Sequence, residues 1–162
     1  CALPILPFFD QMTIYEKNSI SSNINTGLNE WIARHPEVDT WLLAGNCTDI
    51  CVYQSALFLR LQANELRLQR RVIVAQDCVN TYDLPVETAR AIGALPHDGD
   101  LLHTLFLYHM ALNGVEIIQE NKDFLNGGIQ DQADQFFISF HGTPAFQEIR
   151  LSSIILYRGV RR

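Results

Sequence analysis

Apolar positions in the first 118 residues gather into short blocks separated by longer amphipathic stretches. The blocks rich in β-branched, aliphatic or aromatic residues have the length of strands. They are Met12–Tyr15, Thr40–Ala44, Arg71–Ala75 and Val115–Ile118. Because these blocks are almost continuously apolar, both faces of each strand should be covered, which is typical of a parallel sheet flanked by helices.

Between the predicted strands, apolar residues recur at the spacing of a helix face. Two such faces are Ile24, Leu28, Trp31 and Ile32, then Val52, Ala56, Leu59 and Ala63; two further helices are predicted at Val86–Ile92 and Asp98–Leu112. This alternation predicts an α/β fold with a three-layer, Rossmann-like α/β/α arrangement and a mostly parallel sheet. Reactive groups in such folds gather beyond the carboxyl ends of the strands.

The pattern changes after Glu120. Residues 121–135 are polar and contain a Gly127-Gly128 pair, and apolar character returns only at Ile154–Tyr157. We therefore expect a domain over residues 1–119. Residues 120–162 are expected to form a divergent C-terminal tail that this pattern does not place in the strand–helix alternation.

Composition narrows the class of protein. With 48% apolar and 19% charged residues, the 162-residue chain has the balance of a packed, soluble domain. Its net charge of −6 disfavours nucleic acid and anionic membranes as partners, and no apolar run approaches the roughly 20 residues of a membrane span. Cysteines 1, 47, 51 and 78 form no CxxC pair, so reduced thiols and a cytoplasmic location are expected.

The stretch Ala44–Val52 carries the strongest chemical signal. It leaves an apolar strand, turns at Gly45 and enters a helix, which puts Cys51 in the first helical turn. There the free N–H groups and the helix dipole favour an anion, so we expect a stabilised Cys51 thiolate that acts as a nucleophile. The N–H groups of Cys51 and Cys47 would hold a developing oxyanion, and Thr48 or Asp49 would cap the helix.

The other cysteines and Lys17 are compared with Cys51 by their positions in the predicted elements. Cys47 and Cys78 are interpreted as small buried apolar residues, an interpretation that the strand–turn–helix setting disfavours for Cys51. Lys17 follows the Met12–Tyr15 strand and so lies at the same carboxyl edge. A lysine at a strand end is more often a solvated charge, but beside Cys51 it would favour the thiolate.

These residues resemble a known family. Gly45–Val52 is similar to the Gly-x-x-Thr-Asp-x-Cys-Val signature of isochorismatase-like cysteine hydrolases, which include nicotinamidases. Lys17 occupies the place of the family's lysine, and Asp77–Asp83 resembles its strand-end Asp-x-Val segment. Asn113–Val115 resembles its final helix-to-strand turn, so the resemblance covers roughly Pro4–Ile118.

The resemblance implies an activity. In this family an Asp, a Lys and a Cys attack an amide or similar carbonyl and form a thioester that water cleaves. It implies Cys51 and Lys17 as catalytic residues, a small-molecule substrate, and a cis peptide bond between Asn46 and Cys47 that aims two N–H groups at the oxyanion. It leaves the substrate open among nicotinamide, N-carbamoyl compounds and isochorismate.

The chain also departs from the family. The strand that ends in the family's catalytic aspartate has no counterpart before Lys17, and Asp10 is interpreted as a loop or capping residue. The metal ligands of nicotinamidases belong to the same absent region, so no metal is carried over, and no cofactor is implied. The chain is either a truncated piece of a longer hydrolase, as its start at Cys1 suggests, or a variant that has lost part of the machinery. Missing first strands would expose a central sheet edge, so a homo-oligomer or a poorly stable protein is expected.

Two interpretations compete with a hydrolase. A binding or assembly subunit would explain the missing aspartate and the divergent tail, whereas a nucleotide-binding Rossmann domain is disfavoured because no strand leads into Gly-x-Gly-x-x-Gly. His97, His103 and His109 lack the spacing of helical zinc ligands, so helix capping by Asp98 or Asp100 and partly buried histidines are expected instead. Tyr82 and Asp83 would line a pocket or an oligomer contact.

Overall fold

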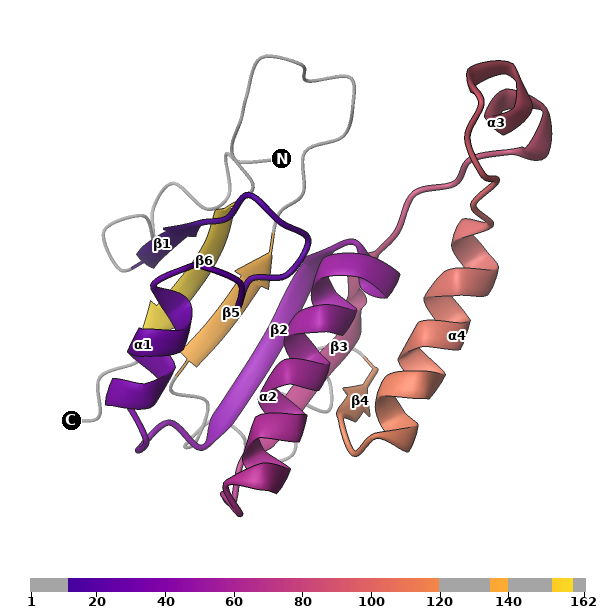
Figure 1. The fold of residues 1–162 in the computed structure, drawn as a ribbon. Coiled ribbons are helices and arrows are strands. Elements are labelled where there is room, and N and C mark those ends of the chain that lie inside the picture. Colours follow the sequence, from indigo (N-terminus) through magenta and orange to yellow (C-terminus); the bar gives the residue numbers. More distant parts are fainter. Residues whose placement is uncertain (1–11, 120–134, 140–152, 159–162) are drawn as a thin grey trace.

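The computed structural model describes residues 12–119, 135–139 and 153–158, with the last two segments described as strands (Figure 1). In chain order the elements are β1 (Met12–Glu16), α1 (Leu28–Arg34), β2 (Thr40–Asn46), a π-helical turn η2 (Thr48–Val52), α2 (Tyr53–Glu65), β3 (Arg71–Asn80), α3 (Val86–Ile92), α4 (Gly99–Leu112), β4 (Glu116–Ile118), β5 (Gln135–Ser139) and β6 (Ser153–Arg158). The four strands and four helices predicted from periodicity are all present.

The strands form one sheet in the order β1-β6-β5-β2-β3-β4. β5, β2, β3 and β4 run parallel, and β6 runs antiparallel to both of its neighbours, β5 and β1. β1 therefore points the same way as β2, and its carboxyl end lies at the same edge of the sheet. The predicted mostly parallel sheet is confirmed.

The C-terminal region contributes two strands to this sheet. β5 pairs with β2, with Leu42 opposite Phe136 and Gly45 opposite Ser139. The expected exposed central edge is therefore not found at β2, because this strand is hydrogen-bonded to β3 on one side and to β5 on the other. Apolar periodicity did not predict the pairing of β5 with β2, because the sequence before β5 is polar.

The described helices that cover the sheet lie on one face of it, as Figure 1 shows for α1, α2 and α4. The main core on that face comprises Leu28, Ile32, Val38, Trp41, Leu43, Val52, Ala56, Leu59, Val72, Val74, Val79, Leu107, Met110 and Val115. A small cluster of Leu42, Ile73 and Ala75 lies on the opposite face. The described residues thus supply two of the three predicted layers. None of the helices in this part of the chain has the length and apolar character needed to span a bilayer.

The segment between β3 and α4 leaves the sheet and returns to it. α3 projects away from the other helices (Figure 1), and the segment closes where Leu84 and His97 form a two-bond antiparallel bridge. α4 then begins at Gly99, where the Asp98 side chain accepts from the N–H of Leu101. Capping by Asp98 is confirmed.

Helix α2 provides a matched test of this packing. Leu59 is 2% exposed in the main core, whereas Leu61 is 53% exposed on the same helix. Leu59→Ala should lower the free energy of unfolding by about 2–5 kcal/mol because it leaves a cavity. Leu61→Ala should change it by less than about 0.5 kcal/mol. Urea unfolding of both variants measures the difference, and equal losses would contradict the assigned orientation of α2.

Candidate active site

The turn that carries Cys51 begins where β2 ends. Gly45 has a φ of 117°, a conformation that residues with a Cβ rarely adopt, and the bond between Asn46 and Cys47 is a cis peptide, at the position where the resemblance implies one. The carbonyl of Cys47 accepts from the N–H groups of Ile50 and Val52, which closes η2. Cys51 is fully buried in this turn and belongs to neither of the two hydrophobic clusters.

Lys17 lies beside Cys51. It follows β1 directly and is only 4% exposed. Its Nζ is 3.5 Å from the Sγ of Cys51 and donates to the carbonyl of Ser19 at 2.9 Å. The structure therefore brings together the two side chains that the sequence assigned to catalysis, and it places them on the same rim of the sheet.

The predicted capping of this turn is wrong. The N-cap position is Cys47, and no side chain caps the turn. Thr48 Oγ1 instead lies 2.9 Å from Nδ1 of His103 on α4, and Asp49 turns toward the segment that follows β3. Both side chains have partners that are distant in sequence, so neither serves the local helix end.

Asp49 is held at both carboxylate oxygens. Its Oδ1 accepts from the Thr81 hydroxyl at 2.5 Å, and its Oδ2 is 2.8 Å from Nε2 of His97. Both side chains of the His97–Asp49 pair are mostly buried, at 12% and 7% exposure. The His97 ring also stacks on Tyr82 with a centroid separation of 3.9 Å. Sequence reasoning missed this cluster, although Asp49 and Thr81 both follow neighbouring parallel strands.

A buried polar network fixes the loop that follows Lys17. Ser22 and Ser55 are buried, and their hydroxyl oxygens are 2.7 Å apart. Ser55 lies one helical turn after Cys51, so this bond joins the loop directly to the helix behind the thiol. Asn23 and Asn29 add two further hydrogen bonds between the loop and α1. No periodic pattern of apolar residues predicts these contacts.

The other described cysteines differ from Cys51. Burial raises the pKa of the Cys47 thiol, with added contributions from Asp49 and Cys51, whereas hydrogen bonds from Thr81 and Tyr82 oppose the shift. Cys78 is exposed, so its prediction as a buried residue is wrong, whereas Cys47 is buried as predicted. Desolvation and then Asp77 raise the pKa of Cys78. Both groups thus remain thiols at neutral pH.

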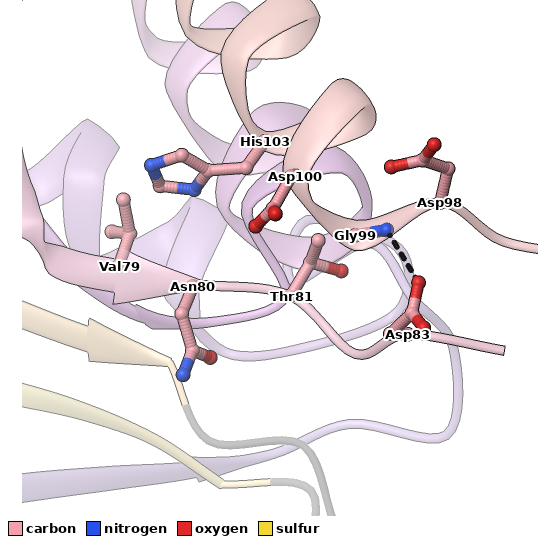
Figure 2. A pocket seen from close by; sticks show the side chains of 8 residues that line it. All are labelled: Val79, Asn80, Thr81, Asp83, Asp98, Gly99, Asp100 and His103. Carbon is pink, nitrogen blue, oxygen red and sulfur yellow. Dashed lines mark hydrogen bonds between the residues drawn. The ribbon is translucent and has the colours of Figure 1, made fainter.

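A cavity of about 690 Å³ opens between the end of β3 and the start of α4. Figure 2 shows its lining, which comprises Val79, Asn80, Thr81, Asp83, Asp98, Gly99, Asp100 and His103. Asp83 faces this cavity and accepts from the N–H of Gly99 at 3.0 Å. Thr81 and His103 also contact the turn that carries Cys51, so the cavity adjoins that turn.

His109 and Asp10 are the remaining candidates from the sequence. His109 Nδ1 is 3.1 Å from the hydroxyl of Tyr53, and within residues 12–119 and the two C-terminal strands no group of three or more His, Cys, Asp or Glu could hold a metal ion. Asp10 lies outside the described residues. β5, the strand beside β2, contains no Asp or Glu.

Comparisons with known proteins point to one family. The sequence model of the isochorismatase domain matches residues 3–117. Among solved structures, a nicotinamidase from Staphylococcus aureus is 20% identical, with a TM-score of 0.47, over 65% of this chain and 52% of that chain. An isochorismatase-like hydrolase from Alkaliphilus metalliredigens is 17% identical, with a TM-score of 0.47, over 69% and 48%.

A pyrazinamidase/nicotinamidase from Streptococcus mutans is 26% identical, with a TM-score of 0.43, over 63% of this chain and 44% of that chain. The chain thus spans about half the length of these structures. No curated protein matches the chain.

The interaction energy between the hydroxyls of Ser22 and Ser55 can be measured by a double-mutant cycle. Ser55→Ala should lower the free energy of unfolding by about 1–2 kcal/mol, because it leaves a buried hydroxyl without this partner. Ser22→Ala should cost a similar amount, and the double variant should cost less than the sum by at least about 0.5 kcal/mol. Gln54→Ala, at the exposed neighbouring position of α2, is the control. Strict additivity would show that the two hydroxyls do not interact.

Proposed function

The chain belongs to the isochorismatase domain family, and on that basis we propose that it carries the nucleophile half of a cysteine hydrolase. The bond cleaved would be an amide or a related bond in a small molecule. The observation that supports this proposal most strongly is the 3.5 Å contact between Lys17 Nζ and Cys51 Sγ. A buried ammonium at this distance favours the thiolate, which is the nucleophilic form of cysteine.

The proposed reaction has two steps. The Cys51 thiolate adds to the substrate carbonyl carbon, the oxyanion is held by the N–H groups of Cys47 and Cys51, and the carbon–nitrogen bond breaks to leave a thioester. The nitrogen departs with one added proton. Water then attacks the thioester, which releases the acid and restores the sulfur. The resemblance assigns the proton transfers to an aspartate, and we assign that role to no residue of this chain.

Access to the thiol constrains the mechanism. Cys51 has 0% exposure, so a covering segment must move before a substrate carbonyl can reach Sγ. Nicotinamide and N-carbamoyl compounds are the first substrates to test, since the family that the chain resembles includes enzymes that use them, and both have the carbonyl and the carbon–nitrogen bond that these two steps require. Isochorismate has no such bond, so its hydrolysis would need a different step.

A second candidate function is a binding or assembly subunit without turnover. The observation that favours it is that β5, the strand paired with β2, contains no Asp or Glu. Mass spectrometry after mixing with substrate separates the two functions. An acyl adduct on Cys51 supports the hydrolase. The absence of both adduct and product, in a protein that still binds a partner without substrate, supports the subunit.

Replacement of the thiol tests the role of Cys51. Cys51→Ala should lower kcat/KM for the best substrate by at least about 10³-fold, because it removes the sulfur that forms the thioester. Cys78→Ala is the matched control, and it should retain activity because the Cys78 thiol is exposed on β3 and has a raised pKa. A Cys51→Ala variant that keeps full amidase activity would reject the mechanism.

Replacement of the ammonium tests the role of Lys17. Lys17→Met should lower kcat by about a hundredfold, because it removes the charge beside the sulfur while keeping most of the apolar stem. Lys17→Arg keeps the charge and should lose less activity than Lys17→Met. Thermal unfolding of both variants shows whether the protein stays folded. Equal activity losses in the two folded variants would mean that shape and not charge matters at this position.

A further inference from the structure

His97 is fixed by its backbone as well as by its ring. Its N–H donates to the carbonyl of Leu84 at 3.0 Å, and its carbonyl accepts from the N–H of Leu84 at 2.7 Å. These two bonds close the segment that carries α3 and set the ring against the turn that contains Cys51. The position of the imidazole is therefore determined by the fold and not by a flexible side chain alone.

Each ring nitrogen of His97 faces an acceptor. Nε2 is 2.8 Å from a carboxylate oxygen of Asp49, and Nδ1 is 2.9 Å from the carbonyl oxygen of Tyr82. Next to an ionised Asp49, a neutral imidazole carries one N–H and can satisfy only one of these contacts, whereas the imidazolium donates to both. The hydrogen-bond geometry therefore calls for a proton on each nitrogen and hence a positive charge next to Asp49.

The charge of Asp49 matters because of its place in the chain. Asp49 lies in the same five-residue turn as Cys51 and two residues before it. An uncompensated carboxylate at that place would disfavour a thiolate in the turn. Burial is the main reason why the pKa values of Cys47 and Tyr82 are raised, and the negative charge of Asp49 raises both further.

We propose that His97 is a cationic positioning residue, which balances the charge of Asp49 and fixes η2 so that Cys51 ionises beside Lys17. This inference rests on the proposed role of Cys51 as nucleophile. His97 itself touches no reacting atom, and it acts through Asp49 and the turn. The arrangement supplies a positive charge on each side of η2, from Lys17 at the sulfur and from His97 at the carboxylate.

The titratable groups near His97 come from each element around it. They are Asp49, Cys47 and Cys51 from the end of β2 and from η2, Tyr82 and Asp83 from the segment after β3, and Asp98, Asp100 and His103 from the start of α4. Among these groups, Asp49 is the one whose side-chain oxygen lies within hydrogen-bond distance of the His97 ring.

The charge of His97 can be observed directly. A ¹⁵N-labelled protein gives imidazole correlation spectra in which cationic and neutral rings differ, and His97→Gln assigns the resonance. We expect His97 to show the cationic pattern at about pH 8, where an ordinary histidine is neutral. A neutral tautomer with one protonated nitrogen would overturn the inference, and this readout does not depend on any catalytic activity.

The effect on Cys51 is measured by titration of ¹³Cβ-labelled cysteine, with Cys51→Ser used to assign the resonance. In His97→Gln the thiolate fraction of Cys51 at neutral pH should fall about three- to tenfold, because Asp49 is left without its countercharge. In the double variant Asp49→Asn/His97→Gln the fraction should return to within about twofold of the unmodified protein. A purely structural role would lower the unfolding temperature of both variants and leave the thiolate fraction unchanged, which would overturn the inference.

The experiments keep two failures apart. If His97 is cationic and Cys51 responds as expected but Cys51→Ala retains full amidase activity, the proposed function fails while the charge balance stands. If Cys51→Ala is inactive but His97 is neutral, the proposed function stands and the inference about His97 fails. Should His97→Gln not fold, the imidazole spectrum of the unmodified protein still decides the charge.

Discussion

The ammonium of Lys17 is almost completely enclosed, at 4% exposure, and its contacts include the carbonyl of Ser19 and the sulfur of Cys51. Burying an ammonium costs several kcal/mol unless its environment offers compensating partners. The Ser19 carbonyl offers a dipole, whereas Cys51 offers a group that can become an anion. These two contacts thus give the buried ammonium its polar partners on the side of the Cys51 turn.

This contact requires three parts of the chain to hold their positions. The loop after β1 is joined to α2 through the hydroxyls of Ser22 and Ser55. This hydrogen bond holds the loop that follows Lys17 against the helix that follows Cys51. The turn itself is held from the other side, where Thr48 meets His103 and Asp49 meets His97. All of these groups meet at one edge because β1, β2 and β3 run in the same direction. These polar contacts thus hold the loop and the turn on either side of the buried Cys51 sulfur.

Periodicity and strand direction account for what the sequence could predict. Apolar spacing located the helices and strands up to Ile118, and a shared carboxyl edge was enough to bring Lys17 to Cys51. Local rules failed for Thr48 and Asp49, because capping considers neighbours a few residues away, whereas their partners lie 55 and 48 residues along the chain. β5 was missed because the apolar run of this short strand follows a polar, aperiodic segment.

The neighbourhood of Cys51 also shows why one cysteine of this region is distinguished from another. Asp49 stands two residues from Cys47 and two residues from Cys51, so sequence distance alone would give both thiols the same unfavourable negative charge. Cys47 is desolvated with a raised pKa, and Asp49 adds to that shift. Cys51 instead has the ammonium of Lys17 at its sulfur. The path of β1 and its loop, and not the cysteine motif alone, therefore gives the two thiols different surroundings.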